Sequence, residues 1–279
     1  MIGIDAKAAS IRIGPIVVRV LGSSKVVQWL LPQHEDFLTE EPEDILLKVR
    51  TSSEPFLGPS MPSVRESPAG LELAYHGWRA VRSKGCVEAQ IYTGPEAATR
   101  GPRRLASLLR VLMQTQLAGH GLALHGATLA QGGFAWVCVG ARGAGKTTLA
   151  RRYVTNPRLG DDYAVLEAEH AGFRAHGTPY TGREGTWSQP GDLPLRAIVL
   201  LKQSNRLMAT RLCRSDAFPL VLRHVIAADI SQYGVSRRLR VLERLVSTVP
   251  VVNLEFRRND DIWEPVMQAV GPAYWVEAR

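Results

Sequence analysis

The chain has 279 residues, and its 34 lysines and arginines outnumber its 26 aspartates and glutamates by eight. Apolar residues make up 45% and charged residues 22%, a balance typical of a folded globular protein and not of a disordered one. No apolar run approaches the roughly 18 residues of a membrane-spanning helix. Three cysteines without a C-x-x-C pair suggest neither a disulfide framework nor zinc. We therefore expect a cytoplasmic protein with no membrane partner.

The positive charge comes from 28 arginines and 6 lysines that are spread along the chain, without a block of five like charges. A basic balance can indicate binding to nucleic acid or to an acidic partner. Dispersed arginines are more typical of solvated surfaces. We therefore expect no nucleic-acid partner, and RNA or DNA binding stays an alternative that the charge alone suggests.

Hydrophobic patterning divides the chain near residue 100. Pro102 predicts the first turn of a helix, whose apolar face is Leu105, Leu108, Leu109 and Leu112. Strand-like runs precede it at 11–20, 45–50, 71–76 and 86–92. Beyond it, strand-like runs at 122–130, 134–139, 163–167, 195–201 and 251–256 alternate with helix-like runs at 146–154, 216–228, 237–247 and 262–270. Such alternation predicts an α/β domain over 101–279 after a small β-rich domain over 1–100.

Residues 140–147 match the phosphate-loop pattern G-x-x-x-x-G-K-[ST], between an apolar strand and a helix-like run. Glycines in such a loop let backbone N–H groups converge on phosphates. Lys146 would reach the β- and γ-phosphates, and the Thr147 hydroxyl would bind magnesium. The predicted ligands are therefore ATP and Mg²⁺. The predicted nucleotide-binding residues are Gly140, Ala141, Arg142, Gly143, Ala144, Gly145, Lys146, Thr147 and Thr148.

A histidine is expected near this loop because a hairpin leads into it. Gly132-Gly133 predicts a two-residue turn between two strand-like runs. If Gln131 faces Phe134, His125 lies opposite Gly140 at the base of the loop, near the γ-phosphate. The alternative is a histidine bonded to backbone on a half-buried strand, and a slip of one residue would move it to the other face.

Two adjacent aspartates, Asp161 and Asp162, follow the helix-like run after the loop. An acidic residue at the end of the next strand can bind a metal or act as a base. Neighbours on a strand point to opposite faces, so both could serve only if the strand is broken there. An ordinary turn is the alternative, because Gly-Asp-Asp favours turns.

Three segments in this order resemble the catalytic domain of HPr kinase/phosphorylase and related kinases, in particular their uncharacterised branches. They are Leu124-His125-Gly126, the 140–147 loop and Gly160-Asp161-Asp162. The resemblance covers roughly residues 103–270. It implies a fold of the phosphate-loop kinase type, as in HPr kinase and phosphoenolpyruvate carboxykinase.

The same resemblance implies roles for the site residues. Asp161 would be the general base, and Asp162 would be the partner of Mg²⁺ together with Thr147. His125 would lie beside the base and tune its protonation. Lys146 would be the phosphate-loop lysine.

The family's later metal- and acceptor-binding segment has no clear counterpart in the chain, and Arg183 and Glu184 could stand in for it. HPr itself is therefore a doubtful substrate. The motifs together predict an ATP-dependent kinase that transfers the γ-phosphate to a hydroxyl of a peptide, a protein or a small molecule. The alternative is a nucleotide-gated binding module with little or no transfer. The acceptor and the oligomeric state stay open.

Overall fold

The computed structural model describes residues 6–30, 34–94, 97–153, 159–180, 188–227 and 232–272. The chain forms two compact units, one of Met1–Ala118 with Ala227–Arg237 and the other of Gly119–Ile226 with Arg238–Arg279. Each unit contains one large β-sheet. Within the described ranges, no helix combines the length and the apolar character that crossing a membrane requires.

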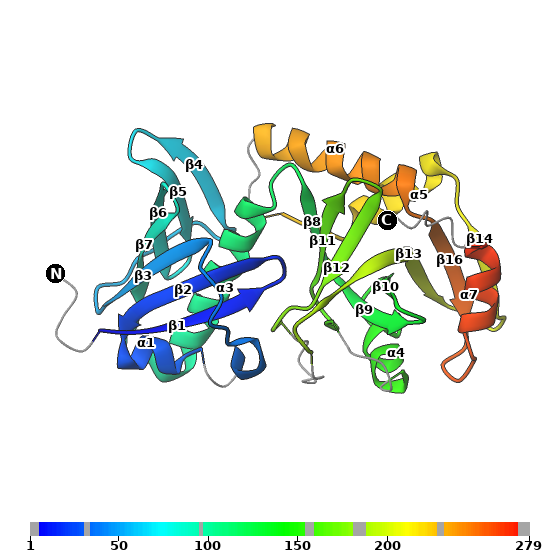
Figure 1. Cartoon of the computed structure of the whole chain (residues 1–279), viewed down its shortest axis with the longest axis horizontal. Coiled ribbons are helices and arrows are strands. Elements are labelled where there is room, and N and C mark those ends of the chain that lie inside the picture. Colours follow the sequence, from blue (N-terminus) through cyan, green and yellow to red (C-terminus); the bar gives the residue numbers. More distant parts are fainter. Residues whose placement is uncertain are drawn as a thin grey trace. The chain divides into compact units, whose positions relative to one another are not determined.

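The sheet of the first unit has the strand order β1-β2-β3-β7-β6-β5-β4 (Figure 1). β2 and β3, and β3 and β7, pair in parallel, and the other neighbours pair antiparallel. The strands are β1 (Ala6–Ile13), β2 (Ile16–Ser23), β3 (Ile45–Ser52), β4 (Ser63–Ser67), β5 (Gly70–Tyr75), β6 (Trp78–Ser83) and β7 (Cys86–Tyr92). The single strand predicted over 11–20 is wrong, because Gly14, with φ of 59°, turns the chain between β1 and β2.

The described residues of this unit also include two short helices, α1 (Ser24–Gln28) and η1 (Glu35–Phe37), and the long helix α3 (Ala97–Gln116). The predicted apolar face of α3 is confirmed, since its four leucines at 105, 108, 109 and 112 are at most 1% exposed. The predicted start at Pro102 is wrong, because the helix begins at Ala97. Proline there removes one backbone hydrogen bond, and burial of the leucine face offsets that loss.

The sheet of the second unit has the order β14-β16-β13-β12-β11-β8-β15, and β10 pairs with both β13 and β9. The pairs β10–β13 and β13–β16 are parallel, and the other pairs are antiparallel. The strands are β8 (Gly121–Leu124), β9 (Gly126–Gln131), β10 (Phe134–Val139), β11 (Ala164–Glu169), β12 (Gly172–His176), β13 (Asp192–Gln203), β14 (Met208–Arg211), β15 (Val225–Ile226) and β16 (Val251–Phe256).

The predicted fold class is wrong. The chain consists of two mixed, many-stranded sheets with few helices, and the second of them does not form an α/β domain of the phosphate-loop kinase type. The expected alternation fails after β11, which turns directly into β12 and pairs with it antiparallel. β12 in turn pairs antiparallel with β13, and no helix lies between β11 and β12. The five-residue run of β12 is too short for its periodicity to reveal it.

Among the residues that the structure describes, four helices belong wholly or partly to the second unit. They are α4 (Lys146–Arg152), α5 (Arg214–Leu222), α6 (Gln232–Thr248) and α7 (Trp263–Val270). α4 and α7 pack on one face of the sheet, and α5 and residues 238–248 of α6 pack on the other (Figure 1). A hydrophobic core lies on each face of the sheet. Trp136 of β10 packs in the core beside α4 and α7, and the next residue, Val137, packs in the core beside α5 and α6. β10 is therefore buried on both faces, which explains its unbroken apolar run.

Candidate functional site

The hairpin of β9 and β10 leads into the predicted phosphate loop. Gln131 pairs with Phe134 and Gly126 with Val139, so the predicted register is confirmed. Gly132 and Gly133 both have positive φ, as a two-residue hairpin turn requires. The strand predicted over 122–130 is wrong in one respect, because it is broken at His125. β8 before the break pairs with β11, whereas β9 after it pairs with β10.

The segment 140–147, which we call the glycine-rich loop, joins β10 to α4. The Lys146 ammonium donates hydrogen bonds to the carbonyl oxygens of Gly140 at 2.8 Å and Ala141 at 3.3 Å. Only 9% of this lysine is exposed. Burial lowers the pKa of Lys146, and the negative charge of Asp162 acts in the opposite direction. The ammonium thus lies inside the loop, within electrostatic reach of an aspartate.

Gly145 is required by the geometry of this loop. Its φ is 108°, a conformation that favours glycine. A Cβ atom at this position would lie 3.1 Å from Cζ of Phe256 in β16. The other predicted contact residues differ in exposure: Ala141 and Arg142 are exposed, and Thr147 and Thr148 are half-buried at the start of α4.

Asp161 and Asp162 lie in a bend that precedes β11, so the break that both would need is present. The bend is held from both sides. The Thr128 N–H of β9 donates to the Gly160 carbonyl at 2.7 Å, and the Thr178 hydroxyl donates to the Tyr163 carbonyl at 3.0 Å. Asp161 is 3% exposed, whereas the Asp162 side chain is 41% exposed.

Asp162, His125 and Lys146 share one region of the second unit. Nδ1 of His125 lies 3.3 Å from Oδ1 of Asp162. The His125 backbone N–H donates to the His224 carbonyl at 2.8 Å. Burial lowers the pKa of His224, and the positive charges of Lys146, His125 and Arg223 lower it further. The bend, the loop and the break at His125 therefore converge on one charged cluster.

His224 was not predicted from the sequence. The helix expected over 216–228 includes it, but α5 ends at Leu222. The next residues form the two-residue strand β15, in which Val225 pairs with Leu124 of β8. This pairing brings His224 beside His125. A strand of two residues leaves no periodic signal, so sequence patterns could not have found it.

Arg183 and Glu184 lie outside the described residues. Among the residues that are described, no group of three or more His, Cys, Asp or Glu could hold a metal ion. Mg²⁺ is usually bound through one or two carboxylates together with substrate phosphates. The oxygen donors of Asp162 and Thr147 therefore match the chemistry expected for Mg²⁺ bound with a nucleotide.

A second polar network lies at the ends of β13 and β16. The Glu255 carboxylate, on a side chain that is 7% exposed, accepts hydrogen bonds from Lys202 at 2.9 Å, Ser204 at 3.3 Å and Arg206 at 2.6 Å. Hydrogen bonds from Arg206 and Lys202 lower the pKa of Glu255 from 4.5 to about 2.

The Glu255 network predicts a loss of stability in acid. A carboxyl group whose pKa is lower in the folded state stabilises the fold above its unfolded pKa, and the contribution disappears as the pH falls through the folded pKa. We expect the stability advantage of the wild type over Glu255→Gln to shrink between about pH 4.5 and pH 2. Thermal unfolding of both proteins across this range measures it. Glu72→Gln, at an exposed strand position, is the control. A difference that stays constant with pH contradicts the prediction.

The second unit thus combines a mixed sheet with a glycine-rich loop of phosphate-binding sequence and a neighbouring Asp–His pair. Residues 103–270 match the model of the family described as SynChlorMet cassette protein ScmC. The match covers more than half of the chain, and the chain belongs to this family. Comparison with curated proteins gives no match.

The resemblance to HPr kinase/phosphorylase and other phosphate-loop kinases is therefore wrong as a family assignment. Three short motifs carried it, and together they occupy few of the matched residues. Such motifs specify the local chemistry of a turn or loop, but not how the strands of a sheet connect. Roles for Asp161, Asp162 and His125 must therefore rest on their positions in this structure.

Proposed function

We propose that this chain is an ATP-dependent phosphotransferase that transfers the γ-phosphate to a hydroxyl of a peptide, a protein or a small molecule. One observation carries the proposal. The sequence-matched loop, with Lys146 inside it, lies in the same charged cluster as Asp162 and His125. A loop for phosphates, a lysine and paired carboxylates are the parts that phosphoryl transfer requires.

The tip of the loop is not covered by other described parts of the chain. A Cβ atom at Gly143 would meet no described residue other than its two chain neighbours within 4 Å, so the chain is open at this position. Residues 140–148 would hold the phosphates, and Thr147 and Asp162 would hold Mg²⁺. Bound there, the ion would neutralise charge on the phosphate oxygens.

The positions of the side chains suggest which of them binds phosphate and which accepts the proton. Lys146 exchanges the carbonyls of Gly140 and Ala141 for phosphate oxygens. Asp162 contacts His125 and acts electrostatically on Lys146, which supports its assignment to the phosphates and Mg²⁺. Asp161, almost fully buried in the same bend, is left to accept the proton of the acceptor hydroxyl as the general base. The hydrogen bonds of Thr128 and Thr178 keep this bend in place.

The cysteines support a cytoplasmic location as part of the proposal. Cys86, Cys138 and Cys213 are all free. Disulfides form and persist mainly in oxidising compartments, so free cysteines suit a reducing one.

The test is phosphate transfer from ATP labelled at its γ-phosphate. The protein is incubated with Mg²⁺ and separate panels of hydroxyl-bearing peptides and small molecules, and mass spectrometry detects an added phosphate. Calorimetric titration with ATP measures binding in parallel. Transfer to one panel supports the proposal and identifies the acceptor class. Tight binding without transfer to any panel supports a nucleotide-gated binding module, and absence of binding contradicts both functions.

A further inference from the structure

One peptide unit of the glycine-rich loop, between Gly143 and Ala144, is held at both polar ends. The Ala144 N–H donates to the Ala141 carbonyl at 3.0 Å. The Gly143 carbonyl accepts a hydrogen bond from the side-chain amide of Gln203 at 2.9 Å. Gly143 has φ of 82°, and apart from Gly143 and its two chain neighbours no described residue has an atom within 4 Å of the position a Cβ would occupy. Backbone sterics therefore do little to stop this peptide from rotating.

Gln203 lies on a strand end that touches the loop twice. It is the last residue of β13 and pairs with Phe256 of β16. Phe256 is the residue whose ring lies against Gly145. One pair of neighbouring strand residues thus supplies a polar contact to Gly143 and an apolar contact to Gly145.

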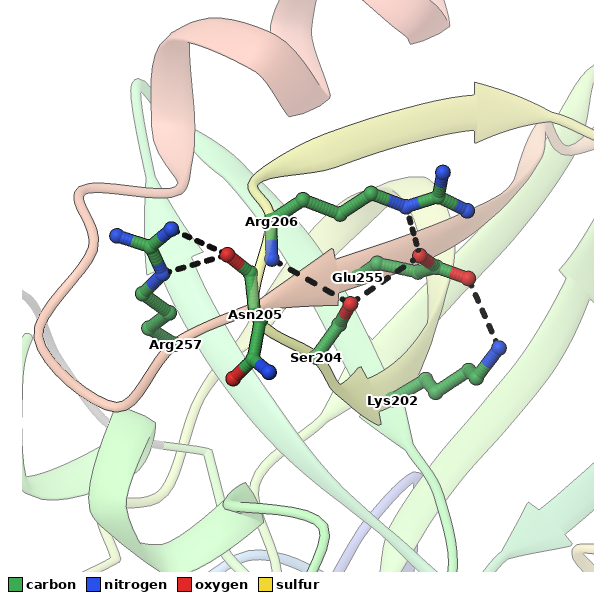
Figure 2. A network of polar contacts seen from close by, with 6 residues as sticks. All are labelled: Lys202, Ser204, Asn205, Arg206, Glu255 and Arg257. Atoms are coloured by element: carbon green, nitrogen blue, oxygen red, sulfur yellow. Dashed lines mark hydrogen bonds and ion pairs between the residues drawn. The ribbon is translucent and has the colours of Figure 1, made fainter.

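The turn that follows Gln203 is tied to the end of β16 (Figure 2). Figure 2 shows the Glu255 carboxylate between Lys202 and Arg206, with the Ser204 hydroxyl beside it. The Ser204 N–H also donates to the Phe256 carbonyl at 3.0 Å. Gln203 therefore lies between two residues that the Glu255 carboxylate binds.

A second tie lies further along the same turn. The Arg257 guanidinium donates to the backbone carbonyl of Asn205, at 2.7 Å from its Nε (Figure 2). The turn is thus held before Ser204, where Lys202 donates to Glu255, and after it, where Asn205 accepts a hydrogen bond from Arg257. A side chain that departs from such a fixed strand end can position another group accurately.

We propose that Gln203 is a positioning residue of the nucleotide site: it holds the Gly143 carbonyl turned toward β13, so that the loop presents N–H groups, and not this oxygen, to the phosphates of a nucleotide. That the ligand is a nucleotide rests on the proposed function. That the Gln203 side chain fixes the orientation of the Gly143 carbonyl does not. An inward-facing carbonyl would repel a phosphate, because both carry negative charge on oxygen.

Hydrogen exchange without nucleotide tests the hold directly. Gln203→Ala removes the side chain, and Gln203→Glu keeps its shape but removes the donor. A hydrogen bond contributes a net stabilisation that corresponds to about three- to tenfold in an equilibrium constant. We expect the amides of residues 143–145 to exchange about three- to tenfold faster in both variants. Gln268→Ala, which removes an exposed amide bonded to Glu264 on α7, is the matched control.

ATP titration of the same variants provides the second readout. We expect Gln203→Ala to weaken ATP binding by about three- to tenfold, with an unfolding midpoint close to that of Gln268→Ala. Unchanged exchange of the loop amides in both Gln203 variants overturns the inference, and so does faster exchange with unchanged ATP affinity. If the wild type binds no ATP, the proposed function fails, and the nucleotide role of Gln203 fails with it. The exchange data then still decide whether Gln203 holds the loop.

Discussion

Lys146→Ala is expected to lower phosphate transfer from ATP by about a hundredfold or more. Lys146 as a residue is only 9% exposed, and its ammonium lies 2.8 Å from the Gly140 carbonyl oxygen inside the glycine-rich loop. It is therefore the cation best placed to meet the charge of the β- and γ-phosphates. Removing it leaves the loop without that charge, and alanine has no donor to replace it. Initial rates with γ-labelled ATP, together with the Kd for ATP, measure the loss.

The control for this experiment is Lys48→Ala. Lys48 lies half-buried on β3 of the first unit, with its Nζ 3.9 Å from a carboxylate oxygen of Glu88, whereas the loop belongs to the second unit. Both variants lose one lysine and one positive charge. Their unfolding midpoints must match that of the wild type closely enough to exclude loss of the fold. Transfer by Lys146→Ala at the rate of Lys48→Ala contradicts the proposed site.

Local sequence patterns predicted the parts of the fold that depend on neighbouring residues. The turn Gly132-Gly133 sets the register of β9 and β10. Both glycines adopt positive φ, and the residues on either side of them, Gln131 and Phe134, pair directly with each other. The leucines of α3 follow the helical period, and they are buried as expected. The glycine-rich loop was also visible, since its glycines and lysine have fixed spacing.

Long-range pairing could not be predicted in the same way. Nothing in the five residues of β12 shows that they return antiparallel along β11, and this return removes the α/β alternation. His224 reaches the site only because Val225 of β15 pairs with Leu124 of β8, far earlier in the chain. Gln203 meets Gly143 because β13 lies beside β10. Such contacts arise from how distant strands pack, and residue spacing does not encode them directly.

The paired aspartates provide the second large effect. We expect Asp161→Asn to lower the transfer rate by about a hundredfold or more, because the amide cannot accept the proton of the acceptor hydroxyl. Its affinity for ATP should change little. Asp162→Asn should instead weaken ATP binding at limiting Mg²⁺, because an amide is a poorer ligand than a carboxylate for the ion that Asp162 is proposed to hold together with Thr147. Rates and ATP affinities across a Mg²⁺ series separate the two roles.

Asparagine is nearly isosteric with aspartate, so neither substitution opens a cavity in the bend that Thr128 and Thr178 hold. Asp216→Asn, at an exposed position in the first turn of α5, is the matched control. If Asp162→Asn loses the rate at saturating Mg²⁺ and Asp161→Asn loses only Mg²⁺ dependence, the two roles are exchanged. In that case the exposed carboxylate beside His125 is the base, and the buried one serves the metal. If both variants transfer phosphate at the rate of Asp216→Asn, neither aspartate takes part, and the bend is an ordinary turn.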